Sequence, residues 1–205
     1  MLLLLLFPFN AFLGDTYSAW IQHFFCVIMM DYVTGGAQVN PSVSIASTLY
    51  GWNNFKSMIV RVVAQMAGGI YAFPIMTNLM PGYVLDKMGG PVLGEGVTVA
   101  EGCMYEFLMT MTLMVIIYIA ATQVGLPSQR VVIATAIRAL IYYNAGKSGP
   151  AMNPMIALSW AFYTDKSSIL TLDHFLIYHL APTAGAVAAT LLWKGVEPKP
   201  KAKSD

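Results

Sequence analysis

Long apolar stretches alternate with short polar connections along the chain. The apolar stretches cover residues 16–33, 54–79, 98–122, 130–145 and 172–193. A helix needs about 20 such residues to cross the roughly 30 Å hydrocarbon core of a bilayer, because it rises about 1.5 Å per residue. The pattern therefore predicts five membrane-spanning helices, the shortest of which contains Arg138.

Residues 1–13 are also apolar, but as a helix they would reach only about 20 Å. We interpret them as the end of a first, partial span. A signal peptide fits less well, because the segment lacks a basic start and a small-residue cleavage site, and Pro8 interrupts it early.

Composition supports a membrane protein without a separate soluble domain. The 205 residues include 11 basic and 10 acidic side chains, and 57% are apolar. A soluble chain of this length would carry about 50 charged residues, since roughly 25% is usual. Disorder, nucleic-acid binding and ordinary soluble enzymes are thereby excluded. We expect no catalysis and no cofactor, and no metal site, since no ligand set converges on His174 and His179.

The basic residues predict the orientation of the spans. With a cytosolic C-terminus, seven fall at or near the cytosolic face and three opposite, which obeys the positive-inside rule. The seven are Lys56, Arg61, Arg130, Lys194, Lys199, Lys201 and Lys203, and the three are Lys87, Lys147 and Lys166. Residues 194–205 then form a flexible cytosolic tail.

Two lysines of this tail, Lys201 and Lys203, lie five and three residues from its end. On a cytosolic tail this spacing is typical of the retrieval signal of endoplasmic-reticulum proteins. The alternative is a solvated basic tail beside anionic lipid. We expect an integral protein of the endoplasmic reticulum, with another intracellular membrane or the plasma membrane as the alternative.

Two segments, 34–50 and 147–162, do not fit continuous spans. Each has an Asn-Pro pair, a glycine four residues before it and about ten residues after it that can form a helix: Gly36 with Asn40-Pro41, and Gly149 with Asn153-Pro154. The two lie 113 residues apart, which indicates an internal repeat of residues 1–97 and 98–193. An odd number of spans between them gives the two halves opposite orientations in the membrane.

The chemistry of Asn-Pro suits the start of a half-helix. Asn is a good N-cap, and Pro at the first helical position loses no hydrogen bond. Ten residues cover about 15 Å, so two half-helices that enter from opposite faces meet near the membrane midplane. Their positive dipole ends then face each other, and the amides of Asn40 and Asn153 can donate to a passing oxygen. Ordinary helix caps after loops are the simpler alternative, but they do not explain the repeat.

The paired segments resemble the two Asn-Pro-Ala boxes of the aquaporin (major intrinsic protein) family. Here the boxes are Asn40-Pro41-Ser42 and Asn153-Pro154-Met155. Residues 106–110, Glu-Phe-Leu-Met-Thr, resemble the family's Glu-Phe-x-x-Thr, and Gln65 matches another family position. Residues 61–69, 148–154, 173–175 and 181–182 are most similar to the small basic intrinsic proteins and related superaquaporins, although a Met in the second box departs even from that branch.

The resemblance implies an all-α membrane protein with an aquaporin-like inverted repeat. Six transmembrane helices, the first incomplete here, and two re-entrant half-helices would form a homotetramer with one pore per subunit. It implies that Glu106 binds the backbone of the second re-entrant segment. The function would be passive diffusion of water or small neutral solutes through the bilayer. The alternative is a non-conducting structural subunit, which the altered boxes would fit.

The resemblance also implies a constriction of four residues, one of them usually the Arg after the second box. Counting from the two asparagines gives Trp20, Ile141, Pro150 and Ile156. An error of one turn would bring in His23 instead of Trp20. None of the four is charged, so we expect slow water passage and some passage of less polar solutes, with Trp20 as the steric limit. Arg138 could line the pore, snorkel or pair with a carboxylate.

Small residues recur at helical spacing in two spans that are equivalent in the repeat. Gly68 and Gly69 lie between Ala64 and Ala72, and Gly185 lies between Ala181 and Ala189. Such stripes are typical of closely packed membrane helices.

Overall fold

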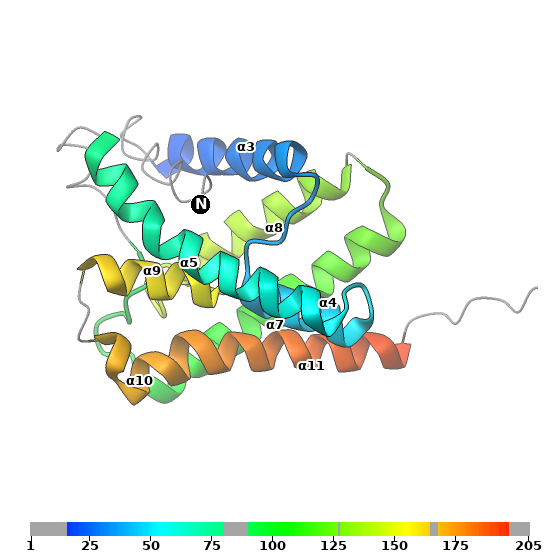
Figure 1. Ribbon diagram of the computed structural model, residues 1–205. Helices are drawn as coiled ribbons and strands as arrows, with labels where there is room; N and C mark the ends of the chain where they lie inside the picture. The colour runs from blue at the N-terminus through cyan, green and yellow to red at the C-terminus, as the bar shows by residue number, and fades with distance from the viewer. Residues whose placement is uncertain (1–15, 80–89, 127, 165–167, 197–205) are drawn as a thin grey trace, which may run out of the picture.

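The computed structural model describes residues 16–79, 90–126, 128–164 and 168–196 (Figure 1). Most of these residues are helical, and no strand occurs among them. The elements in chain order are α3 (Thr16–Thr34), α4 (Pro41–Tyr50), α5 (Phe55–Leu79), α7 (Val99–Gln123), α8 (Ser128–Asn144), α9 (Pro154–Thr164), the 3₁₀ turn η1 (Ser168–Leu170), α10 (Leu172–Phe175), the π-helical turn η2 (Leu176–Leu180) and α11 (Ala181–Val196).

The long helices agree with the apolar stretches. Helices α5 and α7 and the continuous helix Leu172–Val196 are long and apolar enough to cross a membrane. The other two predicted spans correspond to α3, with the shorter apolar part His23–Thr34, and to α8. The partial span predicted for residues 1–13 lies outside the described residues. The chain is an integral membrane protein with an all-α fold.

The last helix continues past the predicted end of its span. It ends at Val196 rather than at residue 193, so the first residues of the predicted tail are helical. Lys194 lies in the last turn, where a cation is favourable, and its Nζ donates to the Leu49 carbonyl at 3.2 Å. Residues 197–205, including Lys201 and Lys203, lie outside the described residues.

The two short helices occupy equivalent places in the bundle. Helix α4 packs mainly against α11 and also against α5, whereas α9 packs mainly against α5 and also against η2. In Figure 1, α9 extends toward the left and α4 toward the right, with α3 along the top and α11 along the bottom. Helix α7 packs against α11 and α8, and α8 packs against α3. Helix α4 thus packs mainly on α11 and helix α9 mainly on α5. This swap of partners is what two half-helices related by an inverted repeat require.

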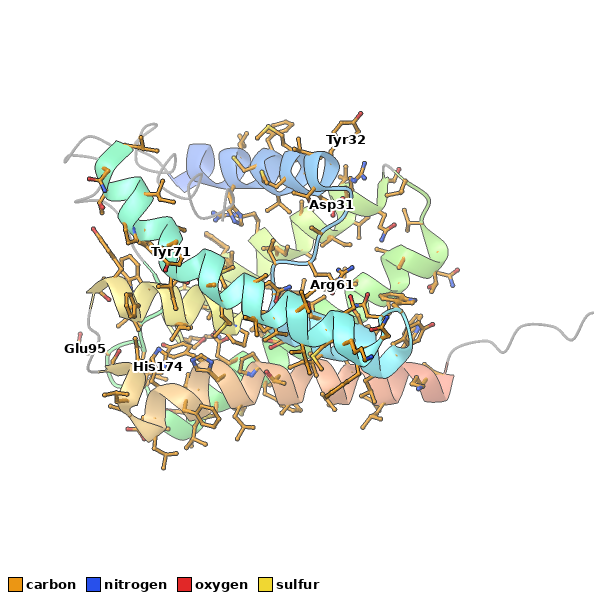
Figure 2. All side chains as sticks on the ribbon, in the orientation of Figure 1. Asp31, Tyr32, Arg61, Tyr71, Glu95 and His174 are labelled. Carbon is orange, nitrogen blue, oxygen red and sulfur yellow. The ribbon has the colours of Figure 1, made fainter. Side chains whose placement is uncertain are left out.

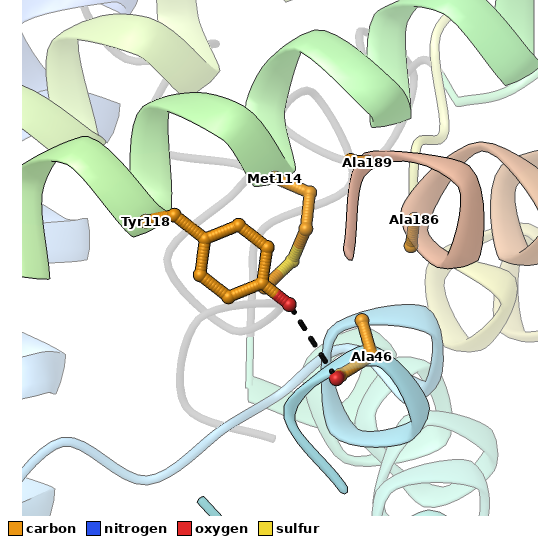
Figure 3. Packing of buried hydrophobic residues seen from close by; sticks show 5 residues of the cluster. All are labelled: Ala46, Met114, Tyr118, Ala186 and Ala189. Carbon is orange, nitrogen blue, oxygen red and sulfur yellow. Dashed lines mark hydrogen bonds between the residues drawn. The ribbon is translucent and has the colours of Figure 1, made fainter. Parts of the chain in front are cut away.

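Helix α4 is held by a buried cluster on α7 and α11 (Figure 3). The Tyr118 hydroxyl of α7 lies 3.4 Å from the Ala46 carbonyl and 2.7 Å from the Thr190 hydroxyl. Ala186 and Ala189 of α11 are fully buried in the same cluster. Small side chains let the helices approach closely, and the tyrosine satisfies the polar groups that the contact removes from solvent.

A π-helical turn interrupts the last helix before Pro182. The Ala181 N–H donates to the Leu176 carbonyl, five residues earlier instead of four. Pro182 has no N–H, so it cannot bond to the carbonyl of Tyr178, and the helix widens at this point. The apolar pattern of residues 172–193 did not predict this turn.

A close contact between α7 and α11 gives a test of the packing. A Cβ on Gly185 would collide with the backbone carbonyl of Phe107 in α7. Because a backbone atom cannot rotate away, we expect Gly185→Ala to lower the free energy of unfolding by about 1–3 kcal/mol. The midpoint of thermal unfolding in detergent would measure the loss.

Gly195→Ala is the matched control on the same helix, since no heavy atom lies within 4 Å of its added Cβ. Removing this glycine should be neutral or stabilise the helix by up to about 1 kcal/mol. Equal unfolding midpoints for the two variants would show that α7 and α11 are not in close contact.

Candidate functional site

Two asparagines cap the two short helices in the same way. Asn40 precedes α4 with an extended backbone, φ −134° and ψ 115°, and its Oδ1 accepts from the Ser42 N–H at 3.0 Å. Asn153 precedes α9, and its Oδ1 accepts from the Met155 N–H at 3.0 Å. Proline follows each asparagine as the first helical residue. The N-terminal ends of α4 and α9 are therefore built alike, as the Asn-Pro pairs predict.

The same two asparagines join the segments to each other. The Asn40 amide nitrogen donates to the Met152 carbonyl at 2.7 Å, and the Asn153 amide nitrogen donates to the Val39 carbonyl at 3.0 Å. Each asparagine thus binds the residue that precedes the other. These reciprocal bonds bring the positive ends of two helix dipoles together inside the bundle.

The amide groups are fixed in orientation. Because each Oδ1 accepts from a backbone N–H, the oxygen and the nitrogen of each side chain can be assigned without ambiguity. Each NH₂ group has two hydrogens, and one is used in the reciprocal bond. One donor remains on Asn40 and one on Asn153. A small molecule that accepts hydrogen bonds is therefore the ligand that these groups suit.

The third residue of each box packs against a neighbouring span. The Ser42 hydroxyl lies 3.0 Å from the Thr183 hydroxyl of α11. Met155 is buried against α5, where a Cβ on Gly69 would approach its Sδ to 2.6 Å. The missing side chain of Gly69 makes room for the unusual methionine. Both third positions thus contact the spans that hold the half-helices.

The second re-entrant segment is held by a buried carboxylate. Glu106 of α7 is fully buried and accepts from the Ser148 hydroxyl at 2.6 Å and from the backbone N–H groups of Ala151 at 3.0 Å and Met152 at 2.7 Å. This is the contact that the family resemblance implies. Three charge-assisted bonds satisfy a group that would otherwise be costly inside a membrane protein.

Two further residues, neither of them predicted from the sequence, hold the same segment. The Asn144 amide donates to the Ser148 hydroxyl at 2.7 Å, and the Tyr178 hydroxyl donates to the Ser148 carbonyl at 2.8 Å. Tyr178 lies in the π-helical turn η2. Only polarity within an apolar span could have indicated Asn144 or Tyr178, and that signal does not identify a partner.

Backbone conformation explains the glycines before the boxes. Gly36 and Gly149 have φ of 83° and 59°, which side chains disfavour, and a Cβ on Gly149 would lie 2.5 Å from backbone atoms of Val92. Met152 adopts a φ of 46° although it is not glycine, at a cost of about 1–3 kcal/mol. Its N–H binds Glu106 and its carbonyl binds Asn40, and these bonds offset the strain.

The first re-entrant segment is held by amides instead of a carboxylate. The Gln65 amide of α5 donates to the Gln38 carbonyl at 2.7 Å and to the Ser44 hydroxyl at 2.9 Å. Ser44 in turn donates to the Gln38 Oε1 at 3.0 Å, and the Gln38 amide donates to Ser47 at 2.9 Å. Gln65 was predicted as a supporting residue, whereas Gln38 was not singled out.

The four residues expected at the constriction come from different elements. Ile141 of α8 packs against the cluster that contains Met152, and Ile156 of α9 packs against Ala72 and Phe73 of α5. Ile141 and Ile156 therefore pack against different buried clusters, and Ile156 belongs to the second re-entrant segment itself. Pro150 is partly exposed within that segment. Trp20 lies in α3, but its side chain is outside the described part of the structure.

The described residues contain no group of three or more His, Cys, Asp or Glu side chains that could hold a metal ion.

A bundle with two half-helices joined at Asn-Pro defines a class of membrane channels, and the comparisons agree. The model of the major intrinsic protein family matches residues 12–193, so the chain belongs to this family. The family predicted from the two boxes is confirmed.

Its similar relatives include plant proteins of the predicted branch. The chain is 28% identical over 175 residues to aquaporin SIP1-2 of Zea mays, covering 82% of this chain and 71% of the relative. It is 29% identical over 182 residues to aquaporin SIP1-1 of Arabidopsis thaliana, covering 87% and 74%. The aquaglyceroporin from Plasmodium falciparum has the same fold, with a TM-score of 0.78 at 18% identity over 95% of this chain and 91% of that one.

The carboxylate of Glu106 gives a test of the site. Glu106→Gln would turn an NH₂ group toward a backbone N–H or the Ser148 hydroxyl, and one donor would lose its acceptor. We expect the free energy of unfolding to fall by about 1–3 kcal/mol, the cost of an unsatisfied buried polar group. Thermal unfolding in detergent would measure it.

Glu101→Gln is the matched control on the same helix. Glu101 binds only the N-terminal cap residue Thr98, at an exposed position. This variant should unfold within a few degrees of the wild type. If the two substitutions lower the unfolding midpoint equally, Glu106 does not hold the second re-entrant segment.

Proposed function

We propose that the chain is a passive channel for water or another small neutral solute. One observation carries this proposal: the two capping asparagines are joined through each other's preceding carbonyls, and each retains one N–H donor. The site offers hydrogen-bond donors and the positive ends of two helix dipoles, which suit the passage of a neutral solute. Nothing in the described residues favours the non-conducting subunit as an alternative.

The proposed path runs past Asn40 and Asn153 in single file. A permeating oxygen accepts hydrogen bonds from the two remaining N–H groups, and it gives up part of its hydration as it does so. The N-terminal ends of α4 and α9 each carry about half a positive charge. Cations and hydronium are therefore disfavoured at the level where the two helices meet. Residues 1–97 and 98–193 would each contribute one half of this arrangement.

The proposed constriction is formed by Trp20, Ile141, Pro150 and Ile156. These residues offer few hydrogen-bonding groups, so a water molecule there loses partners that the chain does not replace. Water should pass slowly, and less polar neutral solutes should compete with it. The partial exposure of Ile141, Pro150 and Ile156 supports this proposal, since a side chain that lines a path is not fully enclosed by protein.

We also propose a homotetramer in the endoplasmic-reticulum membrane. Membership in the family supports the assembly, and the resemblance to its intracellular branch together with Lys201 and Lys203 supports the location.

Reconstitution into liposomes tests the channel. Water flux, measured by light scattering after an osmotic step, should exceed that of empty liposomes by a small factor. Trp20→Ala should raise the permeability to small neutral solutes on the order of ten-fold by removing the steric limit. Ile156→Arg should favour water over those solutes, because the guanidinium supplies the missing donors.

Two results would contradict these assignments. Wild-type flux no greater than that of bare lipid would leave the non-conducting subunit as the function. Unchanged permeability to every solute in Trp20→Ala would remove Trp20 from the constriction.

Replacing Lys201 and Lys203 by Ser tests the proposed location. A tagged double variant should leave the endoplasmic reticulum and reach the cell surface, where surface biotinylation would detect it. Lys194→Ser is a control that removes a lysine outside the retrieval spacing and should keep the wild-type distribution. An unchanged distribution of the double variant would show that Lys201 and Lys203 are not a retrieval signal.

A further inference from the structure

Arg138 lies deep in the bundle and is buried. It is the eleventh residue of α8, about 15 Å along the axis from the first residue, Ser128, and about 9 Å from the last, Asn144. Its exposed fraction is 7%. A side chain that snorkels to the membrane surface would be far more exposed, so Arg138 does not reach the headgroup region.

The charge of Arg138 has no neutralising partner in the described part of the chain. The ion pair found there joins Arg130 to Asp31, and the buried carboxylate of α7, Glu106, is occupied by Ser148 and two backbone N–H groups. The Nε of Arg138 has no hydrogen-bond partner among the described residues. An unpaired guanidinium inside a membrane protein is tolerated where water reaches it.

The ion pair between Asp31 and Arg130 sets the register of α3 against α8. Figure 2 labels Asp31 near the end of α3, and Arg130 lies in the first turn of α8. Eight residues back from Asp31 is His23, and eight residues on from Arg130 is Arg138, about 12 Å along each axis. The two are thus level on helices that pack together, and both side chains are buried.

The same count places the constriction one turn further on. Trp20 is eleven residues back from Asp31, and Ile141 is eleven residues on from Arg130. On α8, Arg138 and Ile141 are three residues apart and therefore share a face. Ile141 packs against the cluster that contains Met152, which directly precedes the second capping asparagine. Arg138 is thus one helical turn from Ile141 and nearly opposite Ala136 and Leu140, which face the cluster of Leu113 and Met152.

From this geometry we infer that Arg138 faces the permeation path and is a selectivity-determining residue of the channel. Its guanidinium gives the path a fixed positive charge. This charge lies one turn of α8 away from the proposed constriction, whose four residues are neutral. It repels cations, and its N–H groups donate to the passing solute. The inference deepens the proposed function and rests on it for the role in selectivity, whereas the contact with water can be tested independently of conduction.

Cysteine labelling tests the contact with water. In a background with Cys26 and Cys103 replaced by Ser, Arg138→Cys should react with trimethylammonium-ethyl methanethiosulfonate added to the aqueous phase. Ala136→Cys is the matched control: Ala136 lies on the same helix and is equally buried, but it packs against Leu113 and Met152. Equal reaction rates at the two positions would overturn the inference.

Ion leak tests the role in selectivity. Proteoliposomes with Arg138→Met or Arg138→Gln should conduct potassium at least about ten-fold faster than the wild type, and Arg138→Lys should keep the leak low because it keeps the charge. Potassium leak at the wild-type level in both neutral variants would overturn the inference. If Arg138→Cys is labelled but the wild-type protein shows no water flux, the proposed channel function is refuted. The contact of Arg138 with water would still stand.

Discussion

The reciprocal hydrogen bonds of Asn40 and Asn153 determine how the rest of the molecule is arranged. Each asparagine binds the carbonyl that precedes the other, so neither half-helix can be placed without its counterpart. The bonds bring two positive dipole ends together, which is unfavourable by itself. The surrounding spans must therefore hold both segments firmly, and the packing of α4 on α11 and of α9 on α5 does so.

The two halves solve the same support problem with different chemistry. A buried carboxylate, Glu106, holds the second segment through two backbone N–H groups and a hydroxyl. The first segment is held by the neutral amide of Gln65, which binds a backbone carbonyl and a hydroxyl. Charge-assisted bonds are roughly twice as strong as neutral ones, so the first segment is the less firmly held of the two among the described contacts. The two halves of the inverted repeat therefore have similar folds, but the hydrogen bonds that hold their re-entrant segments differ in strength.

Periodicity and composition predicted the spans closely, because a membrane demands long apolar helices and leaves few alternatives. The two boxes were found for a similar reason: Asn, Pro and Gly each have a local conformational role that can be identified in the sequence. The partners of Ser148 were not found, since nothing local in Asn144 or Tyr178 says which carbonyl or hydroxyl it will meet. The π-helical turn before Pro182 was also missed, because proline predicts a disturbed helix but not the form that it takes. Long-range contacts between side chains need the three-dimensional arrangement of the helices.

The third residue of each box has a consequence for how such channels can change. Ser42 meets Thr183 on one span and Met155 meets Gly69 on another, so neither side chain of the third position is shaped by the solute alone. A replacement there alters the fit between a half-helix and its neighbouring span, and a second replacement on that span can restore it. The third position is therefore coupled to its packing partner on a span, whereas each asparagine is coupled to the opposite re-entrant segment.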